Sequence, residues 1–147
     1  MTDERQPKFT GMFLVVQDMA AAMAFYRRLG LAIPDGAETQ IHVEIEAGDG
    51  VYLSFGTVQL TTGYDPGWRQ PEGGTPNVLQ FHVPSRQRVD DLFADLIAAG
   101  YASHLPPFDA FWGNRYAEVD DPDGNVVGLQ SPTDPTKRGP PPIQVKG

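Results

Sequence analysis

The sequence predicts an α+β fold built from two similar modules. In two places a short apolar strand is followed by an amphipathic helix, and further strand-like segments follow each helix. One helix and a small half-covered sheet bury too little apolar surface to be stable alone, so the two modules are expected to share a core. We therefore predict a single domain over residues 8–132, in which the order βαβββ occurs twice.

Module one is predicted over residues 8–62. Its first strand covers residues 12–16, and Asp18 is a good N-cap for the helix that follows. The apolar residues of this helix recur at helical spacing and a glycine ends it: Ala22, Phe25, Tyr26, Leu29 and Gly30. Residues 41–46 and 51–55 are predicted to pair across the turn A-G-D-G, and V-Q-L-T-T from Val58 is a candidate fourth strand.

Module two is predicted over residues 77–132, after a linker loop over residues 63–76 that shows no periodicity. Residues 78–83 form its first strand. An apolar stripe marks its helix, with a glycine as the stop: Val89, Leu92, Phe93, Leu96, Ile97 and Gly100. Residues 111–119 and 125–130 are predicted to pair around D-D-P-D-G, and residues 133–147 form a Pro-rich flexible tail.

The composition excludes several classes of function. The chain has no cysteine, so thiolate nucleophiles, disulfides and Cys-ligated metal clusters are excluded. A net charge of -8 disfavours a nucleic-acid partner, although the same field would attract a cationic small molecule. No apolar run approaches the ~18 residues of a membrane span, and the polar N-terminal segment is unlike a signal peptide. These features favour a cytoplasmic protein.

Three segments carry a resemblance to a known family: V-V-Q-D-M-A-A-A-M-A-F-Y-R-R-L-G-L, D-L-F-A-D-L-I-A-A-G and R-Y-A-E-V-D-D-P-D-G-N-V-V-G-L. They resemble the glyoxalase/bleomycin-resistance/dioxygenase group, the vicinal oxygen chelate superfamily, and the resemblance covers residues 9–132. It implies that the two modules form a U-shaped, partly closed mixed sheet whose interior takes a metal ion or an organic ligand.

The same resemblance implies where a metal ion would bind. Its ligands are expected to be His and Glu at the start of each module's first strand and on each module's last strand. The corresponding positions here are Gly11, Tyr52 or Ser54, Val78 and Gly128. None of these residues is a good metal ligand, so neither a metal nor another cofactor is expected. The acidic segment D-D-P-D-G-N is then best explained as a turn, in which Pro122 fixes φ and Gly124 permits a positive φ.

Two alternatives stay open for the polar residues of the predicted strands. His42 shares a face of its strand with Glu44 and could join His82 in an atypical metal site. A metal-free catalyst could instead use Glu44, His82 or Asp109 as a general base. Side chains of this kind more often lie on the solvent side of a half-exposed sheet. His104 is predicted in a loop after the second helix.

Aromatic side chains are the strongest chemical signal. Trp and Tyr rings stack on planar ligands and carry one polar group, although the same rings could fill the core or a dimer contact. Arg115 and Asp109 could orient the polar groups of a ligand, or simply pair with other surface charges. The predicted ligand-binding residues are Trp112, Trp68, Phe108, Phe111, Tyr116, Tyr64, Phe55, His42, Gln80, His82, Arg115 and Asp109.

The function predicted from the sequence is metal-independent binding of a small molecule, with no catalytic residue. The protein would sequester an antibiotic or another natural product, aromatic or cationic, in an aromatic-lined cleft. A homodimer is expected, with neither nucleic acid nor membrane as a partner. The alternative is a glyoxalase-, isomerase- or dioxygenase-type enzyme with the atypical metal site, or a metal-free biosynthetic catalyst. If the protein is an enzyme, the expected class is a lyase or a dioxygenase.

Overall fold

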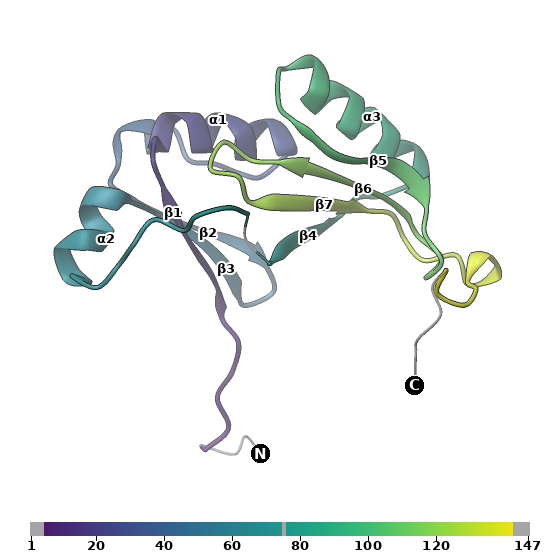
Figure 1. Cartoon of the computed structure of the whole chain (residues 1–147), viewed down its shortest axis with the longest axis horizontal. Coiled ribbons are helices and arrows are strands. Elements are labelled where there is room, and N and C mark those ends of the chain that lie inside the picture. The colour runs from purple at the N-terminus through teal and green to yellow at the C-terminus, as the bar shows by residue number, and fades with distance from the viewer. Residues whose placement is uncertain (1–4, 75, 143–147) are drawn as a thin grey trace. The chain divides into compact units, whose positions relative to one another are not determined.

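The computed structural model describes residues 5–74 and 76–142, and the chain forms two compact units. Unit 1 is Met1–Gln70 and unit 2 is Pro71–Gly147. In each unit a helix follows the first strand of one mixed sheet (Figure 1). The predicted α+β class is confirmed, and neither sheet closes on itself. Within the described ranges no helix is long and apolar enough to cross a membrane.

Unit 1 contains a three-stranded sheet in the order β1-β3-β2. Its strands are β1 (Gly11–Val16), β2 (His42–Gly48) and β3 (Val51–Thr57). Strand β3 lies between the other two, parallel to β1 and antiparallel to β2. Helix α1 (Met19–Leu29) starts at Asp18, whose carboxylate accepts a hydrogen bond from the Ala21 backbone N–H at 3.2 Å. It ends at Gly30, and a short 3₁₀ turn, η1 (Ala37–Thr39), precedes β2.

The candidate fourth strand of module one is wrong. The segment from Val58 forms helix α2 (Val58–Tyr64), which starts where the Thr57 hydroxyl accepts a hydrogen bond from the Leu60 backbone N–H at 3.1 Å. Two alternate apolar residues, Val58 and Leu60, are too short a pattern to establish a strand, and the Thr cap decides for the helix. The sheet of unit 1 therefore has three strands, one fewer than predicted.

Helix α1 covers one face of the unit 1 sheet. Phe25 and Tyr26 are fully buried, and the ring of Tyr26 lies 5.0 Å from that of Phe55 on β3. Because successive residues of a strand point to opposite faces, the alternate residues lie on the other face of the sheet. We call this the open face of unit 1, and its residues are Gly11, Phe13, Val15, His42, Glu44, Glu46, Tyr52, Ser54 and Gly56.

Unit 2 contains a four-stranded sheet in the order β4-β7-β6-β5, with the complete βαβββ arrangement. Its strands are β4 (Val78–His82), β5 (Ser103–Asp109), β6 (Arg115–Asp120) and β7 (Val126–Gln130). The Ser85 hydroxyl caps helix α3 (Arg86–Ala98) by accepting a hydrogen bond from the Arg88 backbone N–H at 3.0 Å. After β7 the chain forms a second 3₁₀ turn, η2 (Pro135–Lys137). Residue 75 of the predicted linker and residues 143–147 of the predicted tail lie outside the described residues.

Two boundaries in module two differ from the prediction. His104 lies on strand β5 and not in a loop. The sequence hides this strand because Pro106 and Pro107 lack backbone N–H groups, which an outer strand tolerates at a break in register such as the one between Leu105 and Phe108. The following strand begins at Arg115, so Phe111 and Trp112 belong to the turn before β6 and not to the strand itself.

Helix α3 packs on one face of the unit 2 sheet (Figure 1). The side chains at this contact come from the helix and from β6 and β7, and they are apolar and almost fully buried: Val89, Leu92, Leu96, Ala117, Val119, Val127 and Leu129. The alternate residues of β4, β6 and β7 form the other face of the sheet. We call this the open face of unit 2, and its residues are Val78, Gln80, His82, Tyr116, Glu118, Asp120, Val126, Gly128 and Gln130.

The acidic segment after β6 is a turn, as predicted. One carboxylate oxygen of Asp121 accepts hydrogen bonds from the backbone N–H groups of Asp123 and Asn125, at 2.9 and 2.8 Å. The other oxygen accepts one from the Asn125 side-chain amide at 2.9 Å. Gly124 has a φ of 83°, which a residue with a side chain rarely adopts. The acids of this segment therefore shape the link between β6 and β7.

Candidate ligand-binding site

Gly128 is the position on the open face of unit 2 that determines the arrangement of its neighbours. It pairs with Gln80 on β4 and with Glu118 on β6. A Cβ atom at Gly128 would lie only 2.5 Å from the phenol oxygen of Tyr116. The absence of a side chain here is therefore what lets the Tyr116 ring lie across β7.

Tyr116 is held in this position by polar contacts as well as by packing. Its hydroxyl donates a hydrogen bond to the Glu118 carboxylate at 2.6 Å. Burial raises the pKa of the Tyr116 phenol well above its usual range, and the Glu118 bond raises it further, while a hydrogen bond with Gln80 opposes the shift. The phenol is therefore neutral at physiological pH.

Four aromatic rings form one cluster beside this tyrosine. The Trp112 ring centre lies 5.3 Å from that of Tyr116 and 5.2 Å from that of Phe111, both edge to face. Phe108 approaches Trp112 and Tyr116 at 6.3 and 6.2 Å, also edge to face. The Trp112 indole N–H donates to the Gln130 side-chain oxygen at 2.9 Å, which fixes the orientation of the ring. Phe108 and Phe111 keep more than a third of their surface exposed, so the cluster presents an aromatic surface to solvent.

A histidine and two carboxylates come together in unit 2, and one of the carboxylates, that of Glu118, also binds Tyr116. His104 on β5 approaches the carboxylates of two open-face residues, Asp120 at 3.2 Å and Glu118 at 3.8 Å. The sequence did not point to these residues as a group. Alternation along β6 places Glu118 and Asp120 on one face, but only recognition of β5 as a strand would have placed His104 beside them.

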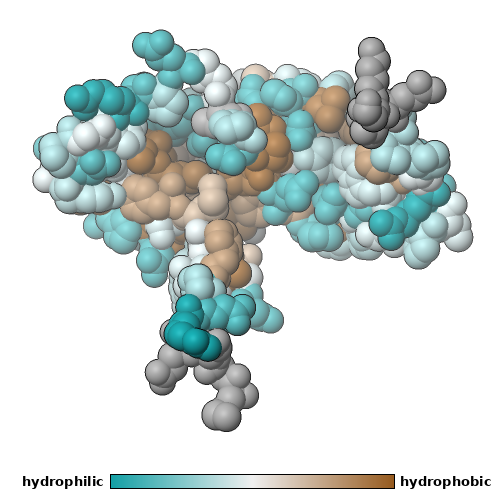
Figure 2. All heavy atoms as spheres, turned by 60° about the horizontal axis from the view of Figure 1, so that its bottom comes forward, coloured by the Kyte–Doolittle hydropathy of each residue, from teal (hydrophilic) through white to brown (hydrophobic). Residues whose placement is uncertain are grey.

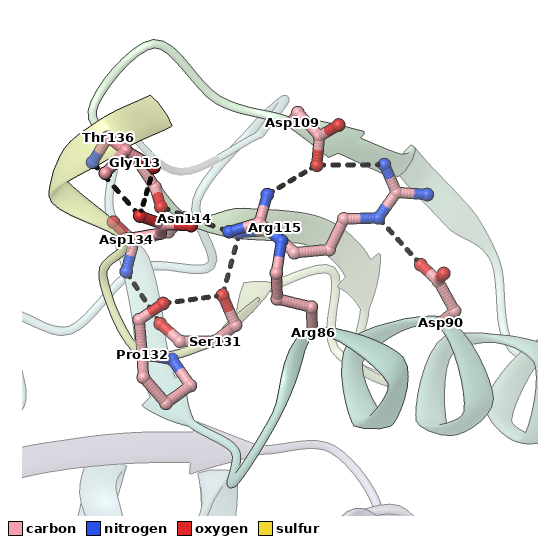
Figure 3. A network of polar contacts seen from close by, with 10 residues as sticks. All are labelled: Arg86, Asp90, Asp109, Gly113, Asn114, Arg115, Ser131, Pro132, Asp134 and Thr136. Atoms are coloured by element: carbon pink, nitrogen blue, oxygen red, sulfur yellow. Dashed lines mark hydrogen bonds and ion pairs between the residues drawn. The ribbon is translucent and has the colours of Figure 1, made fainter. Parts of the chain in front are cut away.

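Arg115 and Asp109 belong to a structural network on the edge of unit 2 (Figure 3). The Asp109 carboxylate binds Arg86 at 2.5 Å and Arg115 at 3.4 Å, and Arg115 also binds Asp90 on α3 at 2.9 Å. The Arg86 guanidinium holds the pKa of Asp109 below its usual range, and the Asp90 carboxylate raises the pKa of Arg115. Of the two alternatives for these residues, the structure therefore favours pairing with other charges.

The same network anchors the turn that carries Trp112. The buried Asn114 side chain donates to the Ser131 carbonyl at 2.6 Å, and the Ser131 hydroxyl accepts from the Arg115 backbone N–H at 2.8 Å. The segment after β7 returns over this turn, where the Gly139 N–H donates to the Phe111 carbonyl at 2.8 Å. The aromatic cluster thus rests on a turn that is hydrogen-bonded on both sides.

The remaining predicted site residues lie in unit 1, apart from Gln80 and His82 on β4. Phe55 is a correction, because it is fully buried against Tyr26 on the α1 side of the sheet and presents nothing to a ligand. His42 lies on the open face of unit 1, where its ring stacks on Phe13 at 6.1 Å. The Phe13 ring in turn lies over Gly56, where an added Cβ atom would collide with it.

Tyr64 and Trp68 lie in and after α2. Tyr64 is largely exposed and, with Ile41 and Leu60, lines a shallow pocket of about 380 Å³. Trp68 is half-buried in the turn that follows, where its backbone N–H donates to the Asp65 carbonyl at 3.2 Å. The space-filling view shows hydrophobic surface in brown beside the segment that leads to the N-terminus (Figure 2). Phe9 and Phe13 are among the exposed apolar residues of this part of unit 1.

The residues at the expected metal positions do not fit a metal ion. Gly11, Val78 and Gly128 offer no donor side chain, and the Ser54 hydroxyl is directed to Glu44 at 3.4 Å. Among residues 5–74 and 76–142, no three His, Asp or Glu side chains come together as possible metal ligands. For the atypical site considered from the sequence, His42 and Glu44 lie in unit 1, whereas His82 lies in unit 2.

Comparison with known families identifies the fold. A sequence model of the Glyoxalase/Bleomycin resistance protein/Dioxygenase superfamily matches residues 8–129. The chain belongs to this superfamily. The predicted resemblance is therefore confirmed. A comparison with curated proteins found no match.

Solved structures of the superfamily share the architecture of this chain. A family enzyme from Burkholderia phytofirmans superposes with a TM-score of 0.71 at 20% identity, over 83% of this chain and 96% of that chain. A glyoxalase-related enzyme from Fulvimarina pelagi gives 0.72 at 21% identity, over 86% and 89%. A lactoylglutathione lyase from Agrobacterium tumefaciens gives 0.61 at 21% identity, over 87% and 96%. At these identities the likeness concerns the fold alone.

Proposed function

We propose that this superfamily member binds a planar aromatic small molecule, without a metal ion, on the open face of unit 2. The observation that carries the proposal is the contact between Gly128 and Tyr116. The position where a metal enzyme of the family would have a carboxylate holds a glycine, and the neutral phenol of Tyr116 lies across it. A metal-binding surface is thereby replaced by an aromatic one, to which Phe108 and Trp112 also contribute.

The chemistry of this surface suits a ligand with a flat ring and hydrogen-bonding groups. The partly exposed rings of Phe108 and Phe111 offer stacking, while Gln80, Glu118 and Asp120 offer polar contacts along the open face of unit 2. Two carboxylates close together favour a ligand that carries a donor or a positive charge, and the net charge of -8 acts in the same direction. Sequestration of an antibiotic or another natural product needs affinity only, so the function does not depend on metal ligands.

The test is a fluorescence titration with planar aromatic antibiotics of neutral, cationic and anionic character. The chain has only two tryptophans, so Trp68→Phe leaves Trp112 as the single indole reporter and serves as the matched control. We expect saturable quenching in wild type and in Trp68→Phe, unchanged after treatment with a chelator. Trp112→Ala, studied in competition with a fluorescent ligand, should weaken binding by about tenfold or more, because the ring supplies the stacking surface.

Three results would count against this proposal. Stoichiometric bound metal whose removal abolishes binding would contradict metal independence. Unchanged affinity in Trp112→Ala would contradict the location of the site. Absence of binding across the whole panel would contradict the ligand class.

A metal-free catalyst is the second candidate, and His104 favours it. The imidazole lies between the carboxylates of Asp120 and Glu118 on the face that we propose binds the ligand, an arrangement suited to a general base. This differs from the bases considered from the sequence, among which Asp109 is bound by two arginines. Turnover of a bound ligand by chelator-treated protein, lost in His104→Gln while the ligand still binds, would favour the catalyst over sequestration.

A further inference from the structure

The segment that follows β7 packs back on the turn that carries Trp112. We call residues 131–142 the C-terminal strap, which contains η2. Figure 3 shows Asp134 and Thr136 of the strap beside Gly113 and Asn114 of the turn. The strap and the turn both belong to unit 2, and the strap lies beyond the superfamily match, which ends at residue 129. The family match therefore does not account for this segment.

Two backbone hydrogen bonds from the strap hold the turn on either side of Trp112. The Gly139 N–H donates to the Phe111 carbonyl at 2.8 Å, and the Asp134 N–H donates to the Gly113 carbonyl at 2.9 Å. Because the residues before and after Trp112 are both bonded to the strap, the direction in which the Trp112 side chain leaves the backbone depends on the strap.

The turn is shaped to receive the strap at Gly113. The φ of Gly113 is 98°, which a residue with a side chain rarely adopts. A Cβ atom there would lie 2.7 Å from the Asp134 carbonyl oxygen and 2.7 Å from Cγ of Arg138. Trp112 itself forms an antiparallel β-bridge with Arg138. The glycine therefore permits close contact with the strap as well as the turn itself.

Side-chain hydrogen bonds fix the strap in turn. The Asp134 carboxylate accepts hydrogen bonds from the Thr136 N–H at 3.0 Å and from the Thr136 hydroxyl at 2.7 Å. These bonds hold η2 together, and the hydroxyl bond keeps the pKa of Asp134 below its usual range. The Thr133 hydroxyl donates to the Asn114 side-chain oxygen at 3.2 Å. The strap therefore meets the turn as a hydrogen-bonded element.

This support matters because Trp112 lies in a turn and not on a strand. A binding residue on a loop is held less precisely than one on a strand, unless neighbouring groups fix it. The turn closes locally through bonds between Ala110 and Gly113 and between Ala110 and Asn114, which do not involve Trp112. The indole bond to Gln130 orients the ring only when the Trp112 backbone is already in place.

We propose that the C-terminal strap positions Trp112 for ligand binding, with Asp134 and Gly139 as the positioning residues. This inference rests on the proposed function and gives the segment beyond the family match a part in it. Neither positioning residue touches the ligand. Both act through Trp112, which contacts the other three rings of the aromatic cluster. A ring that is held in advance loses less freedom when the ligand binds, so the strap raises the affinity.

Gly139→Pro in the full chain tests the strap, because proline removes the N–H that bonds to the Phe111 carbonyl. Arg138 has a φ of -78° and a ψ of 141°, a conformation that the residue before a proline adopts. Gly139→Ala is the matched control, because it keeps the N–H and its Cβ atom meets nothing within 4 Å. Both variants are made in the Trp68→Phe background, which leaves Trp112 as the single indole.

Two measurements are made on each variant after circular dichroism has shown that it is folded. Acrylamide quenching of Trp112 without ligand should increase in Gly139→Pro and stay unchanged in Gly139→Ala. The dissociation constant for the panel antibiotic that binds wild type most tightly should rise about two- to tenfold in Gly139→Pro, the effect of one lost hydrogen bond. Thr133→Val, which removes the hydroxyl bonded to Asn114, should act in the same direction, and Thr133→Ser should restore the wild-type values.

The outcomes separate this inference from the proposed function. Unchanged affinity in a folded Gly139→Pro protein would overturn the positioning role, whether or not the quenching changes. Equal effects of Gly139→Ala and Gly139→Pro would overturn it too, because the lost N–H would not be the cause. If no antibiotic of the panel binds wild type, the proposed function fails and the role in binding fails with it. The ligand-free quenching then still shows whether the strap holds Trp112.

Discussion

Gly128→Ala is the most direct test of the geometry on the open face of unit 2. The added Cβ atom would lie 2.5 Å from the Tyr116 phenol oxygen and 3.0 Å from two of its ring carbons. The ring cannot turn aside freely, because it is only 4% exposed and lies against Trp112 and Phe108. The substitution therefore either strains the ring in place or breaks its hydrogen bond to Glu118.

The expected cost follows from these two alternatives. Overpacking costs ~1–3 kcal/mol, and loss of a hydrogen bond to a charged group costs ~1.5–3 kcal/mol. Alanine recovers ~0.5–1 kcal/mol relative to glycine within a strand. The Tyr116 ring is either strained in place or loses its hydrogen bond to Glu118, so only one of these costs applies. We therefore expect the free energy of unfolding to fall by about 1–2 kcal/mol.

Urea unfolding monitored by circular dichroism measures this change. Gly63→Ala on α2 is the matched control, because a Cβ atom there meets nothing within 4 Å, and it should cost no stability. In the double variant with Tyr116→Phe, which removes the atom in closest contact, the cost should be smaller than the sum of the single costs. Additive costs, or a Gly128→Ala protein as stable as wild type, would refute the contact between Gly128 and Tyr116.

Three further predictions concern stability. Gly56→Ala should cost less than Gly128→Ala, at most about 1 kcal/mol in urea unfolding, because the Phe13 ring that it displaces is 41% exposed and can swing into solvent. Because the folded pKa of Tyr116 is raised, its contribution to stability is complete below the unfolded value of ~10 and is lost above it. Unfolding above pH ~10 should therefore show a loss of stability that Tyr116→Phe reduces. Because Arg86 lowers the pKa of Asp109, the contribution of this carboxylate is present above the unfolded pKa of ~3.9 and is lost below it. Asp109→Asn should thus be less stable than wild type at pH ~7 but differ little near pH ~2, as compared by urea unfolding.

Some elements could be predicted because their signals are local. Asp18 and Gly30 bracket α1 with a side-chain cap and a left-handed stop, and both act on their nearest neighbours in the chain. The turn at Asp121 forms through hydrogen bonds that span at most four residues. Such features depend on a few adjacent residues, so the sequence contains the whole cause.

Other elements could not be predicted because their causes lie elsewhere in the chain. Strand β5 contains prolines that argue against a strand, and it is stabilised by pairing with β6. The fourth strand predicted for unit 1 is a different kind of error, because the Thr57 cap that starts α2 is local and was present in the sequence. Phe55 was predicted to touch the ligand, but the face on which a strand residue lies depends on which side the helix covers.

The sequence by itself determined the two-module pattern, the superfamily and the lack of donor side chains at the expected metal positions. These properties depend on which residue types occur at which spacings, and the sequence alone shows both. Only the tertiary structure decided which side chain occupies the place of the missing donor at Gly128. Tyr116 and Gly128 meet because β6 and β7 pair in one register, and a shift of one residue would place the ring against another neighbour.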